Sequence, residues 1–213
     1  MRSLAGIRSA LSAYEPETLP APSRGNAAVA VILREVDGVP EVLFIERAKR
    51  AGDPWSGHMA FPGGRLDPAD EGARNAAERE TLEEVGVSLA CAEALGRLDD
   101  LQGHPAAARS GAAVISAFVY HVADPGPLKP NREVEQAFWF PLASLFDPER
   151  RVEYPLPWGG LRYPGILVGE PERHVVWGLT YRFLEVFFAI VGHPLPDRWK
   201  ILETSGDAGP ATQ

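Results

Sequence analysis

Apolar residues recur along this chain with two periods, which predicts an alternation of strands and helices. Residues 27–34 form an almost unbroken apolar run, and residues 41–47 form a second run after a turn at Asp37 and Gly38. Asp-Gly between two apolar runs is a strong signal for a β-hairpin. We therefore expect two adjacent antiparallel strands near the start of the folded domain.

Further apolar runs and helical repeats complete the expected order of elements. We predict strands at 58–61, 95–101, 112–122 and 134–140, helices at 1–14, 71–85 and 175–192, and a short helical turn at 142–146. Residues 102–111 and 147–172 are predicted to be loops. Strands with helices inserted between them indicate an α/β sandwich, in which a mixed sheet lies between helices.

The composition supports one folded domain. The length of 213 residues fits one domain better than two, and the 45% hydrophobic content is enough for a core. The 21 Gly and 20 Pro are scattered, which indicates long loops around a compact centre. We expect an N-terminal helix and linker at 1–24, the main domain at 25–203, and a disordered tail at 204–213.

The charge of the chain limits its partners. A formal net charge of −8 argues against nucleic acid and membrane as partners, because both bind basic surface. An anionic small molecule remains compatible if a bound divalent metal supplies positive charge. The single Cys91 cannot form an internal disulfide or a zinc site. No membrane span or signal peptide is predicted, so the cytoplasm is the expected compartment.

Three glutamates on the predicted helix 71–85 are the strongest sign of chemistry. Glu80, Glu83 and Glu84 lie within an arc of about 100° on one helix face. Leu82 and Val85 are expected on the opposite face, where they would pack. The helix would thus have an anchoring face and a carboxylate face.

Carboxylates this close repel one another unless something offsets their charge. Mg²⁺ prefers such oxygen ligands, and a bound metal can neutralise a diphosphate and activate a water. Arg79 would orient a neighbouring carboxylate through a bidentate pair. Gly63 and Gly64 would let the backbone approach a ligand or metal closely. A solvated helix face is the alternative for Glu-x-x-Glu-Glu alone, but it requires neither this upstream Gly-Gly nor the closing Gly86.

This string resembles the signature of the Nudix hydrolase family. The residues that match it directly are Arg79, Glu80, Glu83, Glu84, Gly86 and Val87. Glu71 lies at the expected distance before Arg79, but Gly64 is then one residue too far upstream. Alternatively, Asp70 takes the acidic position and the extra residue follows it. Thr81 stands where the family usually has an apolar residue.

The Phe-Pro-Gly-Gly string at 61–64 and the extra residue look like the coenzyme A pyrophosphatase branch of that family. Arg47, Ala48 and Gly57 correspond to elements of this branch upstream of the string. Two departures are visible. Asp53 stands where the branch has an arginine, and the spacing from Arg47 is one residue longer.

The resemblance implies hydrolysis of a nucleoside diphosphate linked to another moiety, with Mg²⁺ or Mn²⁺. The implied metal ligands are Glu80, Glu83 and Glu84, with a backbone carbonyl of Gly63 or Gly64. Arg79 and Glu84 would belong to the catalytic group. Glu80 leads as the general base, and Glu133 and Glu135 are the alternatives beyond the helix.

The sequence offers several candidate residues for substrate binding and several candidate substrates. Arg47 and Arg50 flank the expected substrate entrance and would contact phosphate beside Gly63 and Gly64. Coenzyme A and its thioesters lead as substrates, and ADP-ribose, NADH, nucleotide sugars and nucleoside triphosphates are the alternatives. A homodimer would fit the family. His58 and His104 would touch phosphate or form polar surface, and Trp55, Trp158 and Tyr163 would stack on a base or pack internally.

Two other classes of function compete with the hydrolase. A Nudix-like binding module would be expected to lose one or more of the three helix carboxylates, and all three are present. A structural calcium site is disfavoured because the preceding loop lacks the alternating acids of a calcium loop.

Overall fold

The predicted hairpin forms the centre of the molecule. The computed structural model describes residues 3–20, 25–50, 56–103, 113–155 and 162–198. Strands β1 (Ala27–Val36) and β2 (Val39–Arg47) are antiparallel and join through Asp37 and Gly38. These two turn residues have φ angles of 51° and 77°. Two consecutive positive φ angles are typical of the type I′ turn, whose twist suits a hairpin.

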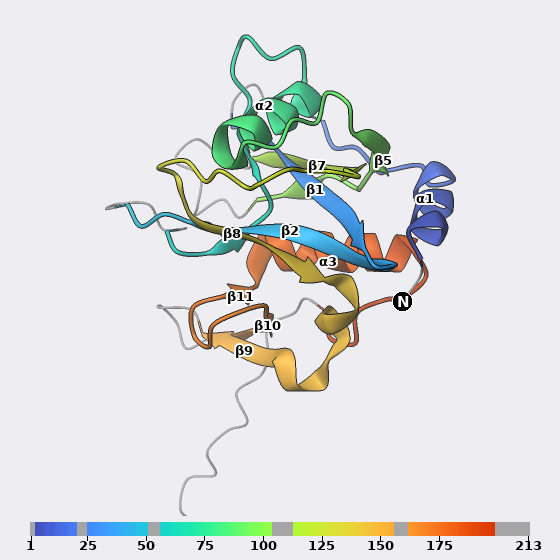
Figure 1. Ribbon diagram of the computed structural model, residues 1–213, viewed down its shortest axis with the longest axis vertical. Helices are drawn as coiled ribbons and strands as arrows, with labels where there is room; N and C mark the ends of the chain where they lie inside the picture. The colour runs from blue at the N-terminus through green and yellow to red at the C-terminus, as the bar shows by residue number, and fades with distance from the viewer. Residues whose placement is uncertain (1–2, 21–24, 51–55, 104–112, 156–161, 199–213) are drawn as a thin grey trace, which may run out of the picture.

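A mixed sheet grows outward from this hairpin (Figure 1). Its main path runs β3 (Met59–Ala60), β2, β1, β7 (Val114–His121) and β5 (Glu93–Arg97). Three further strands pair off this path: β4 (Gly63–Arg65) with β1, β6 (Leu101–Gln102) with β7, and β8 (Val134–Pro141) with β2. The β1–β7 pair is parallel and the others are antiparallel, as expected for a mixed sheet.

Helices cover both faces of this sheet. Helix α2 (Ala73–Val85) lies on one face and α3 (Gly178–Ile190) on the other (Figure 1). Successive residues of β1 alternate between two core clusters. Ala30 and Ile32 pack with residues of α2, whereas Val31 and Leu33 pack with residues of α3. The predicted α/β/α sandwich is therefore confirmed.

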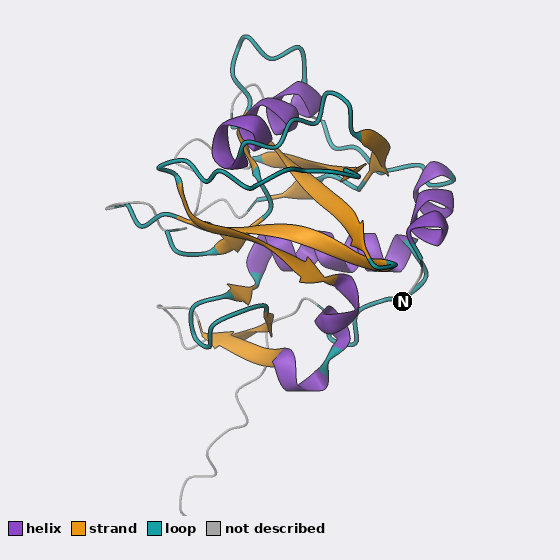
Figure 2. Ribbon diagram, in the orientation of Figure 1, coloured by secondary structure: helices purple, strands orange, loops and turns teal. Residues whose placement is uncertain are grey.

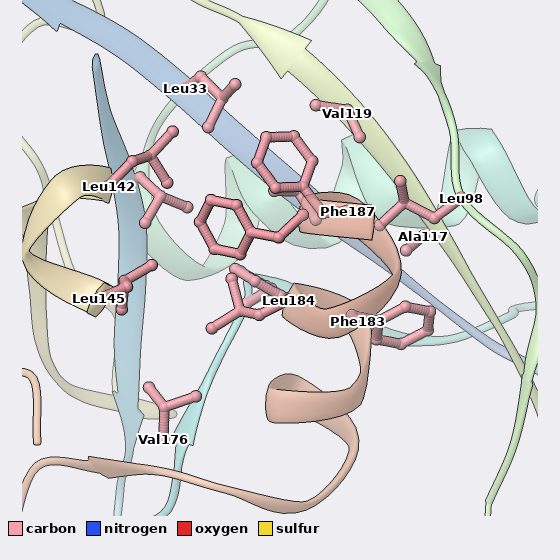
Figure 3. Close-up of a cluster of buried hydrophobic side chains, with 14 of the residues drawn as sticks. Leu33, Leu98, Ala117, Val119, Leu142, Leu145, Val176, Phe183, Leu184 and Phe187 are labelled. Carbon is pink, nitrogen blue, oxygen red and sulfur yellow. The ribbon is translucent and has the colours of Figure 1, made fainter. Parts of the chain in front are cut away.

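The α3 side of the sheet holds the larger cluster. Leu184 and Phe187 of α3 point toward the side of Leu33 of β1 and Leu142 of the 3₁₀ helix η2 (Leu142–Phe146), whereas Phe183 extends from the other side of α3 (Figure 3). All five side chains are at most 2% exposed. The short helical turn expected at 142–146 is thus present, and it closes one end of this core.

The N-terminal segment is part of the same core. Helix α1 (Leu4–Ser12) buries Leu4, Ile7 and Leu11 in the α3-side cluster, and it packs beside β5 (Figure 1). The stretch after it was expected to be a linker. Within this stretch, the Glu17 N–H donates to Asp99 at 2.8 Å and the Leu19 N–H donates to Asp100 at 3.0 Å.

The region expected to be loop-rich contains a second sheet, so that prediction was wrong. Strands β9 (Arg151–Pro155), β10 (Arg162–Leu167) and β11 (Val175–Val176) form a three-stranded antiparallel sheet, drawn below the central one in Figure 2. The 3₁₀ helix η3 (Pro148–Arg150) leads into it. Helix α3 starts at Gly178 and not at 175, because β11 pairs with β10 instead of extending the helix.

Other boundaries also differ from the sequence prediction. The strand expected at 95–101 is divided into β5 and β6. Gly63–Arg65, for which no strand was predicted, is strand β4 and pairs with β1. The loop predicted at 102–111 lies mostly, and the tail predicted at 204–213 wholly, outside the described residues. Within the described part of the chain, no helix is long and apolar enough to cross a membrane.

A buried ion pair joins the second sheet to the first. Glu46 of β2 is 1% exposed, and both of its carboxylate oxygens accept hydrogen bonds from Arg173, at 2.9 and 2.8 Å. Arg173 lies in the turn between β10 and β11. Glu46 directly precedes Arg47, so this pair anchors the C-terminal segment next to the end of β2 that borders the candidate site.

Candidate active site

Helix α2 packs on β1 and β4. Of the two residues predicted to make this contact, Val85 does so and Leu82 does not. Ala77, Thr81 and Val85 are completely buried, and the Thr81 hydroxyl donates to the Ala77 carbonyl at 2.7 Å. This bond explains how a polar residue occupies a position that is usually apolar. Leu82 was predicted to pack, but it is 53% exposed, because the i, i+4 row of Ala77, Thr81 and Val85 makes the contact instead.

Glu84 lies on the same buried side of α2 and faces strand β4. Its side chain is almost fully enclosed, and its Oε2 accepts a hydrogen bond from the Gly63 N–H at 2.9 Å. Burial raises the pKa of Glu84 to about 7, and the charge of Glu80 adds to the rise. The Gly63 N–H and the charge of Arg47 oppose it. Glu84 is therefore a carboxylate whose negative charge is only partly compensated by the protein.

The two glycines make this contact between strand and helix sterically possible. Gly63 has a φ of 151°, and an added Cβ would overlap the Ala28 carbonyl and lie 2.6 Å from the Val29 Cα. A Cβ at Gly64 would lie 2.5 Å from Oε1 of Glu80. Any larger residue at these positions would displace either strand β1 or a carboxylate of α2.

Arg79 is the centre of a network that fixes the neighbouring acids. Its Nε and Nη2 each donate to one oxygen of Asp70 at 3.0 Å, and Nη1 donates to Glu80 at 3.0 Å. Nη1 also lies 3.4 Å from Glu83, and Nη2 donates to the Arg65 carbonyl at 3.2 Å. One guanidinium thus sets the direction of the acids around it, as bidentate pairing allows.

The Arg79 network decides between the two acidic positions that the sequence left open. Asp70, and not Glu71, makes the bidentate pair, and its side chain is only 6% exposed. The hydrogen bonds from Arg79 lower the pKa of Asp70. Glu71 is exposed. Asp70 therefore takes the acidic position of the signature, and the extra residue lies between Asp70 and Arg79.

Glu80 lies between this network and the glycine strand. Burial raises its pKa, whereas the hydrogen bond and charge of Arg79 lower it. Glu83 lies farther out, with a side chain that is 55% exposed. The three predicted carboxylates thus occupy three environments: Glu84 buried, Glu80 half-buried and Glu83 exposed.

Glu133, Arg50 and Arg47 approach this helix from other elements. The carboxylate of Glu133 lies 2.9 Å from Nη2 of Arg50, and its charge contributes to the raised pKa of both Glu80 and Glu84. The charge of Arg47, at the end of β2, lowers the pKa of Glu84. The fold therefore gathers most of the predicted residues, while Glu135 lies exposed on β8.

The donor chemistry of the site fits a hard divalent cation. Glu80 and Glu84 offer carboxylate oxygens next to the two glycines of β4, and both have a raised pKa that a nearby positive charge would reverse. In the described part of the chain, however, no three His, Cys, Asp or Glu side chains already form a group that could hold a metal ion. Arg79 and Gly63 hold the carboxylates at present.

A depression of about 410 Å³ lies on the outer side of α2, away from the glycine contact. Its lining includes Asp70, Arg79, Leu82 and Leu89, but not Glu80 or Glu84. It therefore borders the back of the Arg79 network and not the side on which the carboxylates meet β4.

An aromatic group beside the end of β2 was missed by the sequence analysis. Tyr154 stacks on Trp177 with ring centroids 4.2 Å apart, and His58 contacts the Trp177 ring edge-on at 5.0 Å. The Tyr154 hydroxyl lies 3.3 Å from Nε2 of His58. His58 is therefore held by the second sheet and is not simple polar surface. Tyr163 pairs with Tyr154 in the strand register, and Trp55, Trp158 and His104 lie outside the described residues.

Comparison with known proteins gives consistent matches. The family model of the NUDIX domain matches residues 24–157. An uncharacterised protein of Schizosaccharomyces pombe is 35% identical over 162 residues, which is 65% of this chain and 48% of that protein. The human mitochondrial coenzyme A diphosphatase NUDT8 is 36% identical over 160 residues, which is 73% of this chain and 64% of that protein. The matches thus span about half and just under two thirds of these relatives.

A solved structure supports the fold. The MutT/nudix family protein from Enterococcus faecalis superposes with a TM-score of 0.53, covering 90% of this chain and 70% of that chain. The sequence identity is 19%, so this likeness concerns the fold alone.

Proposed function

Since this chain belongs to the NUDIX family, we propose that it is a metal-dependent pyrophosphohydrolase that cleaves the phosphoanhydride bond of a nucleoside diphosphate linked to another moiety. One observation carries this proposal. Glu84 is buried against the Gly63 N–H with a pKa raised to about 7, while Arg79 holds Glu80 against Gly64. Such enclosed, directed carboxylates are costly for the fold, and they suit a site that receives a cation.

The proposed ligands of Mg²⁺ or Mn²⁺ are Glu80 and Glu84, joined by the exposed Glu83 and by a backbone carbonyl of Gly63 or Gly64. When bound, the cation supplies charge neutralisation of the diphosphate and polarisation of a phosphoryl oxygen. Arg79 then keeps Glu80 in its ligand orientation, because its guanidinium is itself fixed by Asp70 at 3.0 Å.

The general base is a separate question. The sequence favours Glu80, but Glu80 is committed to Arg79 and lies against Gly64. Glu133 is the better proposal, because its carboxylate is 42% exposed and approaches Glu80 and Glu84 from another element. In this role Glu133 accepts the proton of the attacking water. Arg47 and Arg50 lie beside these acids and would contact the phosphate groups of the substrate.

Coenzyme A and its derivatives are the proposed substrates. The 36% identity to the human coenzyme A diphosphatase supports this, together with the Phe-Pro-Gly-Gly string at 61–64. ADP-ribose, NADH, nucleotide sugars and nucleoside triphosphates remain the alternatives. The departure at Asp53 lies outside the described residues.

The test is an assay of the purified chain with Mg²⁺ or Mn²⁺ against coenzyme A and each of these alternatives. Cleavage within the diphosphate of coenzyme A would yield adenosine 3′,5′-bisphosphate and 4′-phosphopantetheine, and both products are to be identified. Folded protein that releases no product from any of these substrates with either metal would contradict the proposal. Binding without turnover would favour the non-catalytic module instead.

Three expectations about partners and location stay predictions. These are a cytoplasmic location, a homodimer, and the lack of nucleic acid or membrane partners. Size-exclusion chromatography with light scattering would measure the assembly state directly.

A further inference from the structure

The turn at residues 131–134 leads into strand β8 and is hydrogen-bonded to the end of helix α2. The Asn131 N–H donates to the Glu84 carbonyl at 2.9 Å, and the Val134 N–H donates to the Asn131 carbonyl at 3.2 Å. The Oδ1 of Asn131 accepts from the Glu133 N–H at 2.7 Å. Asn131 therefore bonds to both Glu84 and Glu133, one a proposed metal ligand and the other the proposed base.

The position of this turn follows from how α2 ends. Gly86 has a φ of 73° and closes the helix with its N–H on the Leu82 carbonyl at 3.0 Å. The last carbonyls of a helix have no partner within it. Here the Lys129 N–H, at 2.8 Å, and the Asn131 N–H satisfy those of Val85 and Glu84. The last turn of the helix, which bears Glu84, thus fixes the position of residues 129–131.

Glu133 is fixed at its backbone more firmly than at its carboxylate. Its carbonyl accepts from the Ala48 N–H at 2.8 Å, just beyond the end of β2, and its N–H is bonded to Asn131. The contact between its carboxylate and Arg50 joins two side chains that are 42% and 48% exposed. Exposed ion pairs are weak, so the direction of the Glu133 side chain depends on these backbone bonds.

From this geometry we propose that Asn131 is a positioning residue, whose side chain holds Glu133 in register with the carboxylates of α2. This inference rests on the proposed function, because it assigns a role to a residue that acts through Glu133. An asparagine side chain that bonds a backbone N–H two residues later forms an Asx-turn. Among the hydrogen bonds of Asn131 to the described residues, this one depends on the identity of residue 131, because the others are made by its backbone.

The substitutions follow from this distinction. Asn131→Ala removes the acceptor for the Glu133 N–H and leaves the backbone bonds to Glu84 and Val134 in place. Asn131→Ser keeps a side-chain oxygen that forms the same kind of turn without adding charge. Arg132→Ala changes an exposed residue of the same turn and serves as the matched control.

The experiment measures kcat and KM for coenzyme A with Mg²⁺, or for ADP-ribose with Mg²⁺ if coenzyme A is not cleaved. Asn131→Ala should lower kcat roughly tenfold with KM within about twofold, because positioning acts on the chemical step. Asn131→Ser should restore at least about half of the lost rate, and Arg132→Ala should behave like the wild type. Circular dichroism melting of each variant checks that the fold is retained.

A double-mutant cycle with Glu133→Gln makes the test specific. If Asn131 acts through Glu133, then Asn131→Ala should change kcat by less than about twofold in the Glu133→Gln background. An equal loss in both backgrounds would overturn the inference, as would full activity of Asn131→Ala or failure of the serine to restore the rate. Full activity of Glu133→Gln together with an inactive Glu84→Gln would overturn it and leave the proposed function standing. Folded wild type without turnover would overturn both.

Discussion

The backbone N–H of Gly63 lies 2.9 Å from Oε2 of Glu84, and this hydrogen bond ties strand β4 to helix α2. It also gives a buried carboxylate its one described hydrogen bond from the backbone. The neighbouring Gly64 lies close to the carboxylate of Glu80, and this approach is possible because glycine has no side chain. The pairing of two glycines with two glutamates therefore defines the site, and the predictions below test its parts separately.

Glu84→Gln should abolish turnover and preserve the fold. The amide keeps the shape and the contact with Gly63 but loses the charge for metal binding, so kcat should fall by roughly a hundredfold or more. Product release with Mg²⁺ measures this. Glu135→Gln, on an exposed residue of β8, is the control and should stay close to wild type. Comparable activity in both variants would remove Glu84 from the proposed metal site.

The stability of the metal-free protein should fall as pH rises through the titration range of Glu84. Its pKa is about 7 in the folded state against the ordinary value of 4.5, so the folded state binds more protons between these values. The favourable contribution is complete below pH 4.5 and lost above pH 7. In denaturant titrations at pH 8, Glu84→Gln should therefore be more stable than wild type, by roughly 3 kcal/mol at most. A less stable Glu84→Gln at pH 8 would contradict this assignment.

Saturating Mg²⁺ should reverse this pH effect in the wild type. A bound cation favours the charged form of Glu84 and stabilises the folded state that binds it. Melting curves at pH 8 with and without Mg²⁺ should show a larger rise in Tm for wild type than for Glu84→Gln. Equal shifts would mean that the cation binds elsewhere.

The two glycines should fail in different ways when replaced by alanine. In Gly63→Ala the new Cβ meets the backbone of β1, so we expect a loss of more than about 2 kcal/mol in the free energy of unfolding. In Gly64→Ala the three atoms nearest the new Cβ all belong to the carboxylate of Glu80, which can move away. That variant should keep most of its stability and lose activity. Thermal melts and kcat for the two proteins, side by side, check the contrast.

Asp70→Asn and Glu71→Gln form a matched pair that tests the Arg79 network. Asp70 is nearly buried in its bidentate pair with Arg79, whereas Glu71 is exposed. We expect Asp70→Asn to lower turnover roughly tenfold, because Asp70 fixes Arg79, which holds the proposed ligand Glu80, and loss of such outer support typically costs ten- to a hundredfold. Glu71→Gln should have little effect. The reverse order would place the acidic position of the signature at Glu71.

Arg173→Ala should loosen the attachment of the second sheet. It leaves Glu46, which is 1% exposed, without its bidentate partner and with Nε2 of His174 at 3.4 Å, and breaking a buried ion pair destabilises strongly. We expect a loss of about 2 kcal/mol or more by denaturant unfolding. Arg162→Ala breaks an exposed pair with Glu153 and should cost less than about 1 kcal/mol. Similar losses in both would show that the Glu46 pair carries little of the attachment.

Local signals in the sequence were sufficient for the hairpin and for α2. The Asp37-Gly38 turn and the closing Gly86 each require a backbone conformation that few residues adopt, so they mark boundaries reliably. The second sheet was missed because Pro164 and Gly165 interrupt the pattern of β10. Its register with β9 and β11 is a long-range property that no short window contains.

The candidate site shows the same division between local and long-range information. The spacing from Arg79 to Glu84 placed the carboxylates on one helix, but it did not tell which of Asp70 and Glu71 would reach Arg79. That depends on how residues 67–71 fold back, with the Asp67 N–H bonded to Asp70 at 2.8 Å. Asn131 was not identified either. An asparagine two residues before Glu133, at the start of a strand, is the local signal that would have indicated the turn.

The burial of α1 has a practical consequence for handling this protein. Leu4, Ile7 and Leu11 fill the core beside β5. A truncated protein that starts at residue 25 would therefore expose a hydrophobic surface there and aggregate. Ser3, by contrast, is exposed, and it caps the helix through its side chain and its carbonyl, which accept from the N–H groups of Gly6 and Ile7. An affinity tag joined ahead of the first residue by a flexible spacer is therefore compatible with the native state, whereas trimming the amino end is not.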